Sequence, residues 1–197
     1  DRKVEQIDER LYTNDDRVIV WWSADEDESD TSRVVIDGHA YSATERRFHV
    51  VEALADGIHW VKVIAIDELG NESAPSAVLW FIVDTKAPEV PGMPTTESPT
   101  NNAEPTWTWP EGGTKPYDDE DEITLGCGFS HYNVYLDGIL VELGEEDRPI
   151  TDPTFTSGTL SDGLHTLEVT SVDLLGNESA KSSAGHVLID TVAPAVP

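Results

Sequence analysis

The sequence DELGNESA at residues 67–74 returns as DLLGNESA at residues 173–180. The offset is 173 − 67 = 106 residues, and the match extends without a gap from residues 54–91 to residues 160–197, with 19 of 38 aligned positions identical. Half identity over a gapless window indicates a duplicated unit, because chance does not produce a match of this length. A fixed internal period of this size is typical of tandem modules.

Short segments with period-two alternation surround the repeat, and turn residues separate them. Residues 58–66 place His59, Val61 and Val63 on one face, which predicts a half-buried strand whose histidine belongs to the core. His165 occupies the same position in the second copy. The dipeptides at residues 37–38 and 137–138 are both Asp-Gly, the sequence that favours a two-residue hairpin turn.

Other segments fit the same pattern. Residues 17–22 (RVIVWW) predict a buried strand, and Trp107 and Trp109 lie two positions apart, so both should face a core. No helical periodicity occurs. We therefore predict an all-β chain of two tandem antiparallel β-sandwiches, at residues 1–87 and 88–197. The second carries an acidic insertion at residues 110–128.

The charge balance excludes several classes of partner. The chain has 12 Lys and Arg against 39 Asp and Glu, a net charge of −27. Such a charge repels nucleic acid and anionic lipid, so neither is expected as a partner. No apolar run is long enough to insert into a membrane, and Cys127 is the only cysteine, which excludes an intrachain disulfide. We expect a monomeric fragment of a longer protein.

With the strands placed, the residues point to a family. Residues 160–180 (LSDGLHTLEVTSVDLLGNESA), followed by VLIDTVAPAVP at residues 187–197, resemble the bacterial immunoglobulin-like repeats of very large cell-surface and adhesin proteins. TNNAEPTWTW at residues 100–109 with HYNVYLDG at residues 131–138 resembles a second common stretch of those repeats. The resemblance implies immunoglobulin-like or fibronectin III-like sandwiches in an extracellular stalk at the bacterial cell surface, in many members stiffened by Ca²⁺ between modules.

The repeated loop supports two interpretations. In the first, Gly70 and Gly176 supply a positive-φ turn while Asp67 and Asp173 accept hydrogen bonds from backbone N–H groups. In the second, the loop offers oxygen ligands to a hard cation. In an immunoglobulin-like topology the second copy, the acidic insertion and the connector meet at the module junction. A Ca²⁺ site there would use some of Asp84, Asp173, Asn177, Glu178, Asp118, Asp119, Glu120, Asp121 and Glu122.

An equivalent calcium site in the first module would use Asp67 and Asn71 together with the acidic run at residues 25–30. It would be completed by a preceding repeat.

No catalytic motif is present, so we expect no enzymatic activity. The first expectation for function is an extracellular spacer or adhesion segment that contacts neighbouring repeats, with host or surface glycans and proteins as further candidate partners. The alternative is an accessory, carbohydrate-binding pair of modules in a secreted polysaccharide-degrading enzyme. Trp60, Trp80, Tyr117 and Tyr135 would then supply the sugar-binding surface.

Overall fold

The computed structural model describes residues 4–7, 10–22, 31–44, 48–112, 128–142 and 149–196. It divides the chain into two compact units. Module 1 reaches Lys86, and module 2 begins at Ala87. Among the described residues no helix is long and apolar enough to cross a membrane.

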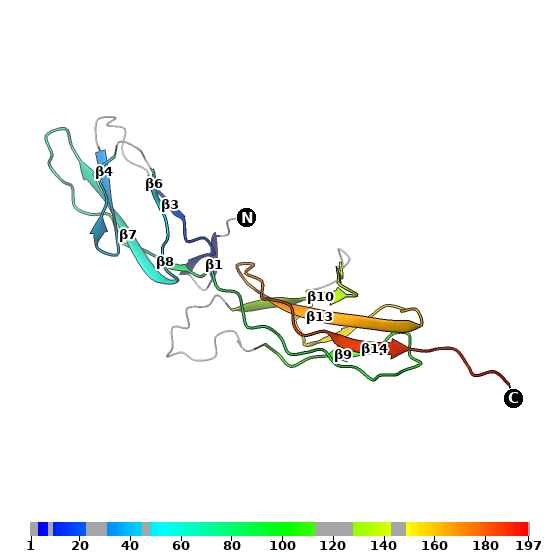
Figure 1. Cartoon of the computed structure of the whole chain (residues 1–197). Coiled ribbons are helices and arrows are strands. Elements are labelled where there is room, and N and C mark those ends of the chain that lie inside the picture. Colours follow the sequence, from blue (N-terminus) through cyan, green and yellow to red (C-terminus); the bar gives the residue numbers. More distant parts are fainter. Residues whose placement is uncertain are drawn as a thin grey trace. The chain divides into compact units, whose positions relative to one another are not determined.

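Module 1 consists of two sheets (Figure 1). The larger has the strand order β1-β2-β8-β7-β4-β5, and the smaller pairs β3 with β6. The strands are β1 (Val4–Ile7), β2 (Arg10–Thr13), β3 (Val18–Trp21), β4 (Thr31–Ile36), β5 (His39–Ala40), β6 (Phe48–Val51), β7 (Gly57–Ile66) and β8 (Leu79–Val83). The core lies between the two sheets and is formed by Val34, Ile36, Val51, Val61, Phe81 and Val83.

Module 2 repeats this plan (Figure 1). One sheet has the order β11-β10-β13-β14 and the other pairs β12 with β9. The strands are β9 (Thr106–Thr108), β10 (Phe129–Leu136), β11 (Ile139–Leu140), β12 (Thr154–Thr156), β13 (Gly163–Asp173) and β14 (Gly185–Ile189). Trp107 and Trp109 are both buried in the core, as their spacing predicts.

The predicted all-β sandwich fold is confirmed in both modules, and most strand pairs are antiparallel. The pairing of β2 with β8 is parallel, and the bridge between Thr100 and Ile189 in module 2 is also parallel. β2 and the segment at Thr100 therefore run in the same direction as the last strand of their own module. The predicted Asp-Gly hairpin turns are also confirmed, since Asp37, Gly38, Asp137 and Gly138 all have positive φ.

The strand predicted at residues 17–22 is present as β3, but the prediction that it is buried is wrong. Val18 and Val20 pack against the core of module 1, but Trp21 is 69% exposed. The reason is that β3 belongs to a two-stranded sheet with only one face on the core, so alternate side chains of an apolar run must point outward. Trp21 instead contacts Phe48 across the strand pair, with ring centroids 4.9 Å apart.

Candidate functional site

The second copy of the repeated loop is held together by the carboxylate of Asp173. Its Oδ1 accepts hydrogen bonds from the backbone N–H groups of Leu175 at 2.9 Å and Asn177 at 2.8 Å, and its Oδ2 accepts one from Asn177 Nδ2 at 2.7 Å. Gly176 has a φ of 86°, which completes the turn. Asp173 and Leu175 are both buried. This is the capping interpretation of the loop.

The first copy has the same geometry in a more exposed setting. Asp67 Oδ1 accepts from the backbone N–H groups of Leu69 and Asn71, at 2.9 and 2.7 Å, and Oδ2 accepts from Asn71 Nδ2 at 2.8 Å. The hydrogen bonds from the side chain and backbone of Asn71 hold the pKa of Asp67 below its usual value. Leu69 is 88% exposed, whereas Leu175 at the matching position is 1% exposed.

Glu178 is engaged within module 2. Its Oε1 accepts hydrogen bonds from Asn133 Nδ2, Tyr135 Oη and Thr170 Oγ1. Burial alone would raise the pKa of Glu178, but these donors outweigh it and hold the pKa below its usual value. The corresponding Glu72 in module 1 forms an ion pair with Arg33, with Nη1 and Oε1 2.6 Å apart. Both glutamates are therefore bound to side chains of their own module.

The repeated histidines also hold turns. His59 Nδ1 lies 2.6 Å from Asp37 Oδ2, and its Nε2 lies 2.7 Å from the Ala55 carbonyl. His165 makes the same contacts with Asp137 and the Ser161 carbonyl, at 2.7 and 2.9 Å. Both histidines are hydrogen-bonded as expected, but only His59 is buried, while His165 is partly exposed.

The polar residues shared by the two modules thus serve the fold. The hydrogen bonds from the Thr85 backbone and side chain to Asp56 recur from Thr191 to Asp162. Each shared carboxylate faces N–H or O–H donors that a sandwich needs to close its turns. The polar residues that are identical in the two modules therefore have structural roles.

The predicted calcium ligands lie in three places. Asp84 is buried in module 1 and accepts a hydrogen bond from Lys86 N. Asp173, Asn177 and Glu178 belong to module 2 and have the contacts given above, while Asp67 and Asn71 cap a turn in module 1. The acidic residues of the insertion and those of the run at residues 25–30 lie outside the described residues, among them Asp118, Asp119, Glu120, Asp121 and Glu122.

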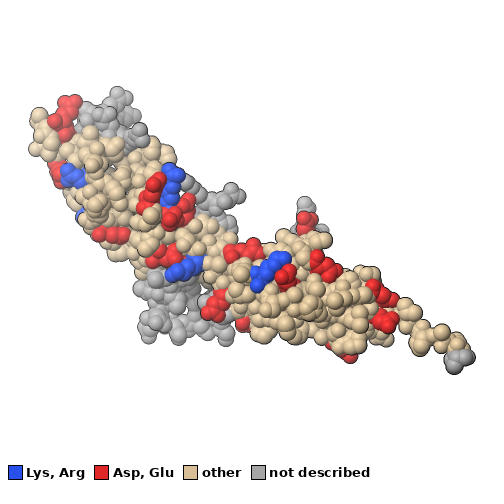
Figure 2. Space-filling view, in the orientation of Figure 1, with Lys and Arg blue, Asp and Glu red and all other residues tan. Residues whose placement is uncertain are grey.

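Within the described part of the chain, no three His, Cys, Asp or Glu side chains are placed to share a metal ion. Oδ1 of Asp173 accepts two hydrogen bonds and Oδ2 accepts one, so this carboxylate is engaged chiefly in closing its turn. The calcium site at the junction stays a prediction that depends on the acidic insertion. On the face shown in Figure 2, acidic side chains are spread along both modules.

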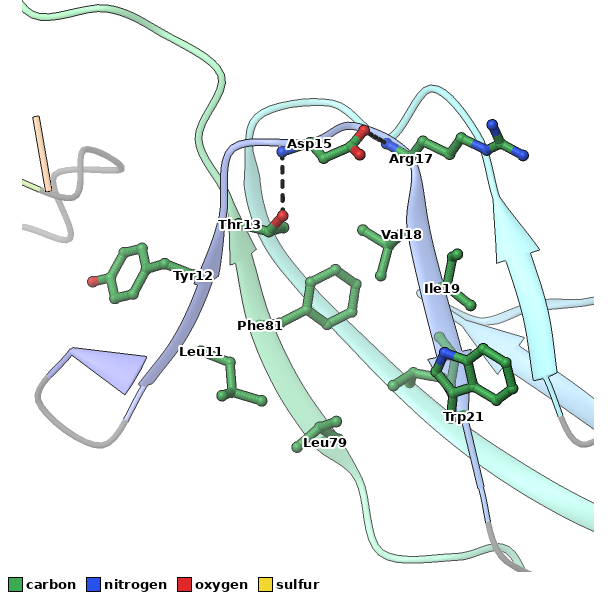
Figure 3. A pocket seen from close by; sticks show the side chains of 12 residues that line it. Leu11, Tyr12, Thr13, Asp15, Arg17, Val18, Ile19, Trp21, Leu79 and Phe81 are labelled. Carbon is green, nitrogen blue, oxygen red and sulfur yellow. Dashed lines mark hydrogen bonds between the residues drawn. The ribbon is translucent and has the colours of Figure 1, made fainter. Parts of the chain in front are cut away.

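Module 1 contains a cleft of about 270 Å³ between its two sheets (Figure 3). Its walls are mostly apolar, and polar groups lie at one end, where Asp15 accepts a hydrogen bond from Arg17 N. The lining side chains include Leu11, Val18, Val20, Trp21, Leu79 and Phe81.

The corresponding position in module 2 is closed by the chain itself. Thr95 and Thr108 exchange two backbone hydrogen bonds, at 2.8 and 2.9 Å. Pro94 is fully buried beside them, and a Cβ on Gly185 would lie 2.1 Å from the Pro94 carbonyl oxygen. Gly185 corresponds to Leu79, since 79 + 106 = 185. The cleft is therefore a gap between the two sheets of module 1 that the chain itself fills at the matching position of module 2.

Two of the four candidate sugar-binding aromatics share one surface. Trp60 and Trp80 face each other across β7 and β8, on the side opposite the core residues Val61 and Phe81. Trp80 is 58% exposed and Trp60 is half-buried. Sequence reasoning could name these residues but not their pairing, which depends on strand register.

Tyr135, the third candidate, is engaged within module 2. The ring of Tyr135 is covered by Lys181, whose Nζ lies 3.8 Å from the ring centroid, and its hydroxyl donates to Glu178. Tyr117 lies outside the described residues.

No protein-family model matches the chain. Exoglucanase B of Cellulomonas fimi is 29% identical over 201 residues, which cover 95% of this chain and 17% of that protein. The chain therefore spans about a sixth of the length of this curated relative.

Two solved structures are similar. The fibronectin(III)-like modules of Clostridium thermocellum CbhA give a TM-score of 0.48 at 14% identity, covering 88% of this chain and 85% of that one. The FN1–FN3 domains of chicken CNTN1 give a TM-score of 0.41 at 12% identity, covering 88% and 62%.

Proposed function

We propose that this chain is a non-catalytic accessory segment of a secreted polysaccharide-degrading enzyme. The observation that carries the proposal is the alignment to exoglucanase B, which covers 95% of this chain but only 17% of that protein. An alignment of 201 residues takes in both modules. The duplicated pair is thus similar to a minor part of a glucan-degrading protein, and most of that protein lies outside the aligned part.

The relative favours the accessory segment over the adhesin stalk, which was the first of the two expectations from sequence. A pair of sandwiches serves equally as a spacer in either setting, because each module has its own core. Folded modules in tandem set a distance between the elements at their two ends. An enzyme on an insoluble polymer gains from such a distance, since the polymer surface restricts the approach of a bulky catalytic domain.

The chemistry of the described residues supports a non-catalytic role. Hydrolysis of a glycosidic bond uses two carboxyl groups about 5 to 10 Å apart in a cleft that accepts the sugar. The cleft of module 1 has mostly apolar walls, and among the described residues that line it Asp15 is the only carboxylate. The repeated carboxylates of Asp67 and Asp173 close turns. We infer that the chain acts outside the cell, where polymeric substrates are found, and that it is monomeric.

Deletion from the full-length protein tests the proposal. The intact enzyme and a version lacking these 197 residues would be compared on a short soluble oligosaccharide and on an insoluble polysaccharide. We expect equal rates on the soluble substrate and a slower release of sugar from the insoluble one after deletion. The isolated chain should hydrolyse neither. A full-length protein with no hydrolase activity, or loss of activity on both substrates, would contradict the accessory role.

A further inference from the structure

The two modules carry different residue types at matching outward-facing positions. Trp60, Lys62 and Trp80 on the outer face of module 1 correspond to Thr166, Glu168 and His186, each 106 residues later. The register is the same in both, since Trp60 pairs with Trp80 and Thr166 pairs with His186. The core positions Val61 and Phe81 stay apolar as Leu167 and Val187, while Trp60 and Trp80 are replaced by polar residues.

The smaller sheets show the same contrast. Ile19 and Trp21 of β3 correspond to Thr106 and Thr108 of β9, at an offset of 108 − 21 = 87 residues. The strand partners of these threonines, Thr156 and Thr154, are also polar. Module 2 thus has polar residues at the positions that match these aromatic side chains on both sheets, while Leu164 and Leu188 are exposed aliphatic neighbours on the larger sheet.

The fold does not need the tryptophan pair. Module 2 builds the same strand pair with threonine and histidine at these positions. Exposed aromatic surface is unfavourable in water, at roughly 25 cal/mol per Å² of apolar area. An exposed aromatic patch on one module, replaced by polar residues on its duplicate, therefore indicates a surface that contacts something.

The chemistry of the surface formed by Trp60 and Trp80 indicates which class of ligand it can bind. Cross-strand neighbours have Cβ atoms about 5 Å apart, so Trp60 and Trp80 lie side by side on the same face of the sheet. A pyranose ring presents a flat face of C–H groups, while its hydroxyls project sideways and remain hydrated. Such a ring covers an indole without burying unsatisfied polar groups. The Lys62 ammonium, 5.5 Å from the centroid of the Trp60 ring, can donate to hydroxyls at the edge.

Charge excludes the acidic polysaccharides. The chain carries a net charge of −27, so a polyanion approaching any part of it is repelled. A neutral glucan carries no such penalty.

We propose that Trp60 and Trp80 form a binding platform for a neutral glucan chain on the outer face of β7 and β8. The proposal rests on the accessory role given above and assigns its contact with polymer to module 1. Module 2 then acts as the polar spacer of the pair.

Binding of a soluble β-1,4-linked glucose hexamer by calorimetry, and retention on insoluble cellulose, test the platform. The variants are Trp60→Thr and Trp80→Thr in the complete 197-residue chain. We expect each to weaken binding about tenfold or more, because each removes an aromatic surface that the sugar covers. Trp80→Tyr keeps a flat ring and should bind within about threefold of the native chain. Urea midpoints close to the native value would show that each variant is folded.

Trp21→Thr is the matched control, because it removes an exposed tryptophan from the other sheet and copies Thr108 of module 2. It should bind like the native chain. Equal losses in Trp21→Thr and Trp60→Thr would overturn the assignment of the site to β7 and β8.

Two further outcomes would overturn the platform. The first is a native chain that binds neither glucan. The second is a native chain that self-associates in sedimentation experiments through a contact that Trp60→Thr breaks, without binding glucan. The accessory role would stand in both cases, because deletion from the full-length enzyme judges it separately.

Discussion

Removal of the two loop carboxylates gives a matched pair of variants, Asp67→Ala and Asp173→Ala. Both side chains accept two backbone hydrogen bonds and one from an asparagine side chain, at 2.7 to 2.9 Å. The two variants thus delete the same interactions. They differ in burial, since Leu69 beside the first is exposed and Leu175 beside the second is buried.

The difference in burial determines how much folding stability each variant loses. In the exposed loop, water replaces the lost acceptor, so Asp67→Ala should cost clearly less stability than the matching change in module 2. In the buried loop, water has little access to the N–H groups of Leu175 and Asn177. Two or three hydrogen bonds to a charged group, at about 1.5 kcal/mol each, then lead to a loss of about 3 kcal/mol for Asp173→Ala.

Urea unfolding, followed by tryptophan fluorescence and circular dichroism, measures these values. Module 2 contains Trp107 and Trp109, and the other four of the six tryptophans belong to module 1, so the two transitions can be assigned. We expect Asp173→Ala to shift the transition of module 2 and Asp67→Ala to shift that of module 1 by clearly less. Equal losses of stability would refute the argument from burial.

Calcium provides a second test of the same carboxylate. The predicted junction site implies that millimolar calcium stabilises the native chain by binding only the folded state. Because N–H donors already occupy the oxygens of Asp173, we expect Asp173→Ala to keep this calcium response. Loss of the response in Asp173→Ala would show that the carboxylate binds the metal. A native chain whose unfolding is the same with calcium and with chelator would contradict the junction site itself.

Two further predictions concern module 2. Gly185→Ala should lower its stability by about 2 kcal/mol or more, because the new Cβ would meet the Pro94 carbonyl oxygen at 2.1 Å, while Gly158→Ala, with open space around it, should leave the urea midpoint unchanged. The hydrogen bonds to Asp137 and the Ser161 carbonyl raise the pKa of His165. Its stabilisation is therefore full below the unfolded pKa of about 6.5 and is lost as the pH rises through the higher folded value. His165→Gln should cost about 1 kcal/mol near pH 5.5 and less near pH 8 in urea titrations, and a cost that grows with pH would contradict the assignment.

Local sequence predicted the elements that depend on local chemistry. Alternation in residues 58–66 predicted β7 and its inward His59, and the Asp-Gly pairs predicted hairpin turns because both residues must accept positive φ. Residues 17–22 show the limit of this reasoning. A continuous apolar run predicts burial, yet β3 buries only alternate side chains because its second face has no covering layer.

Cross-strand pairing could not be predicted in the same way. The contacts of Glu178 with Asn133 and Tyr135 join residues more than 40 positions apart, since 178 − 135 = 43. Nothing within the loop around Glu178 indicates these donors. Register between distant strands decides them.

The sequence by itself determined that the chain is a duplicated pair of β-sandwiches, because the repeated residues close turns and fill cores through local patterns that both copies must keep. Tertiary structure decided which of the remaining residues can meet a ligand. Trp60 and Trp80 are 20 positions apart in the chain, 80 − 60 = 20, and they become one surface only because β7 and β8 pair in a register that sets them opposite each other on the outer face. Strand pairing is a long-range property, so the candidate binding surface became visible only with the fold.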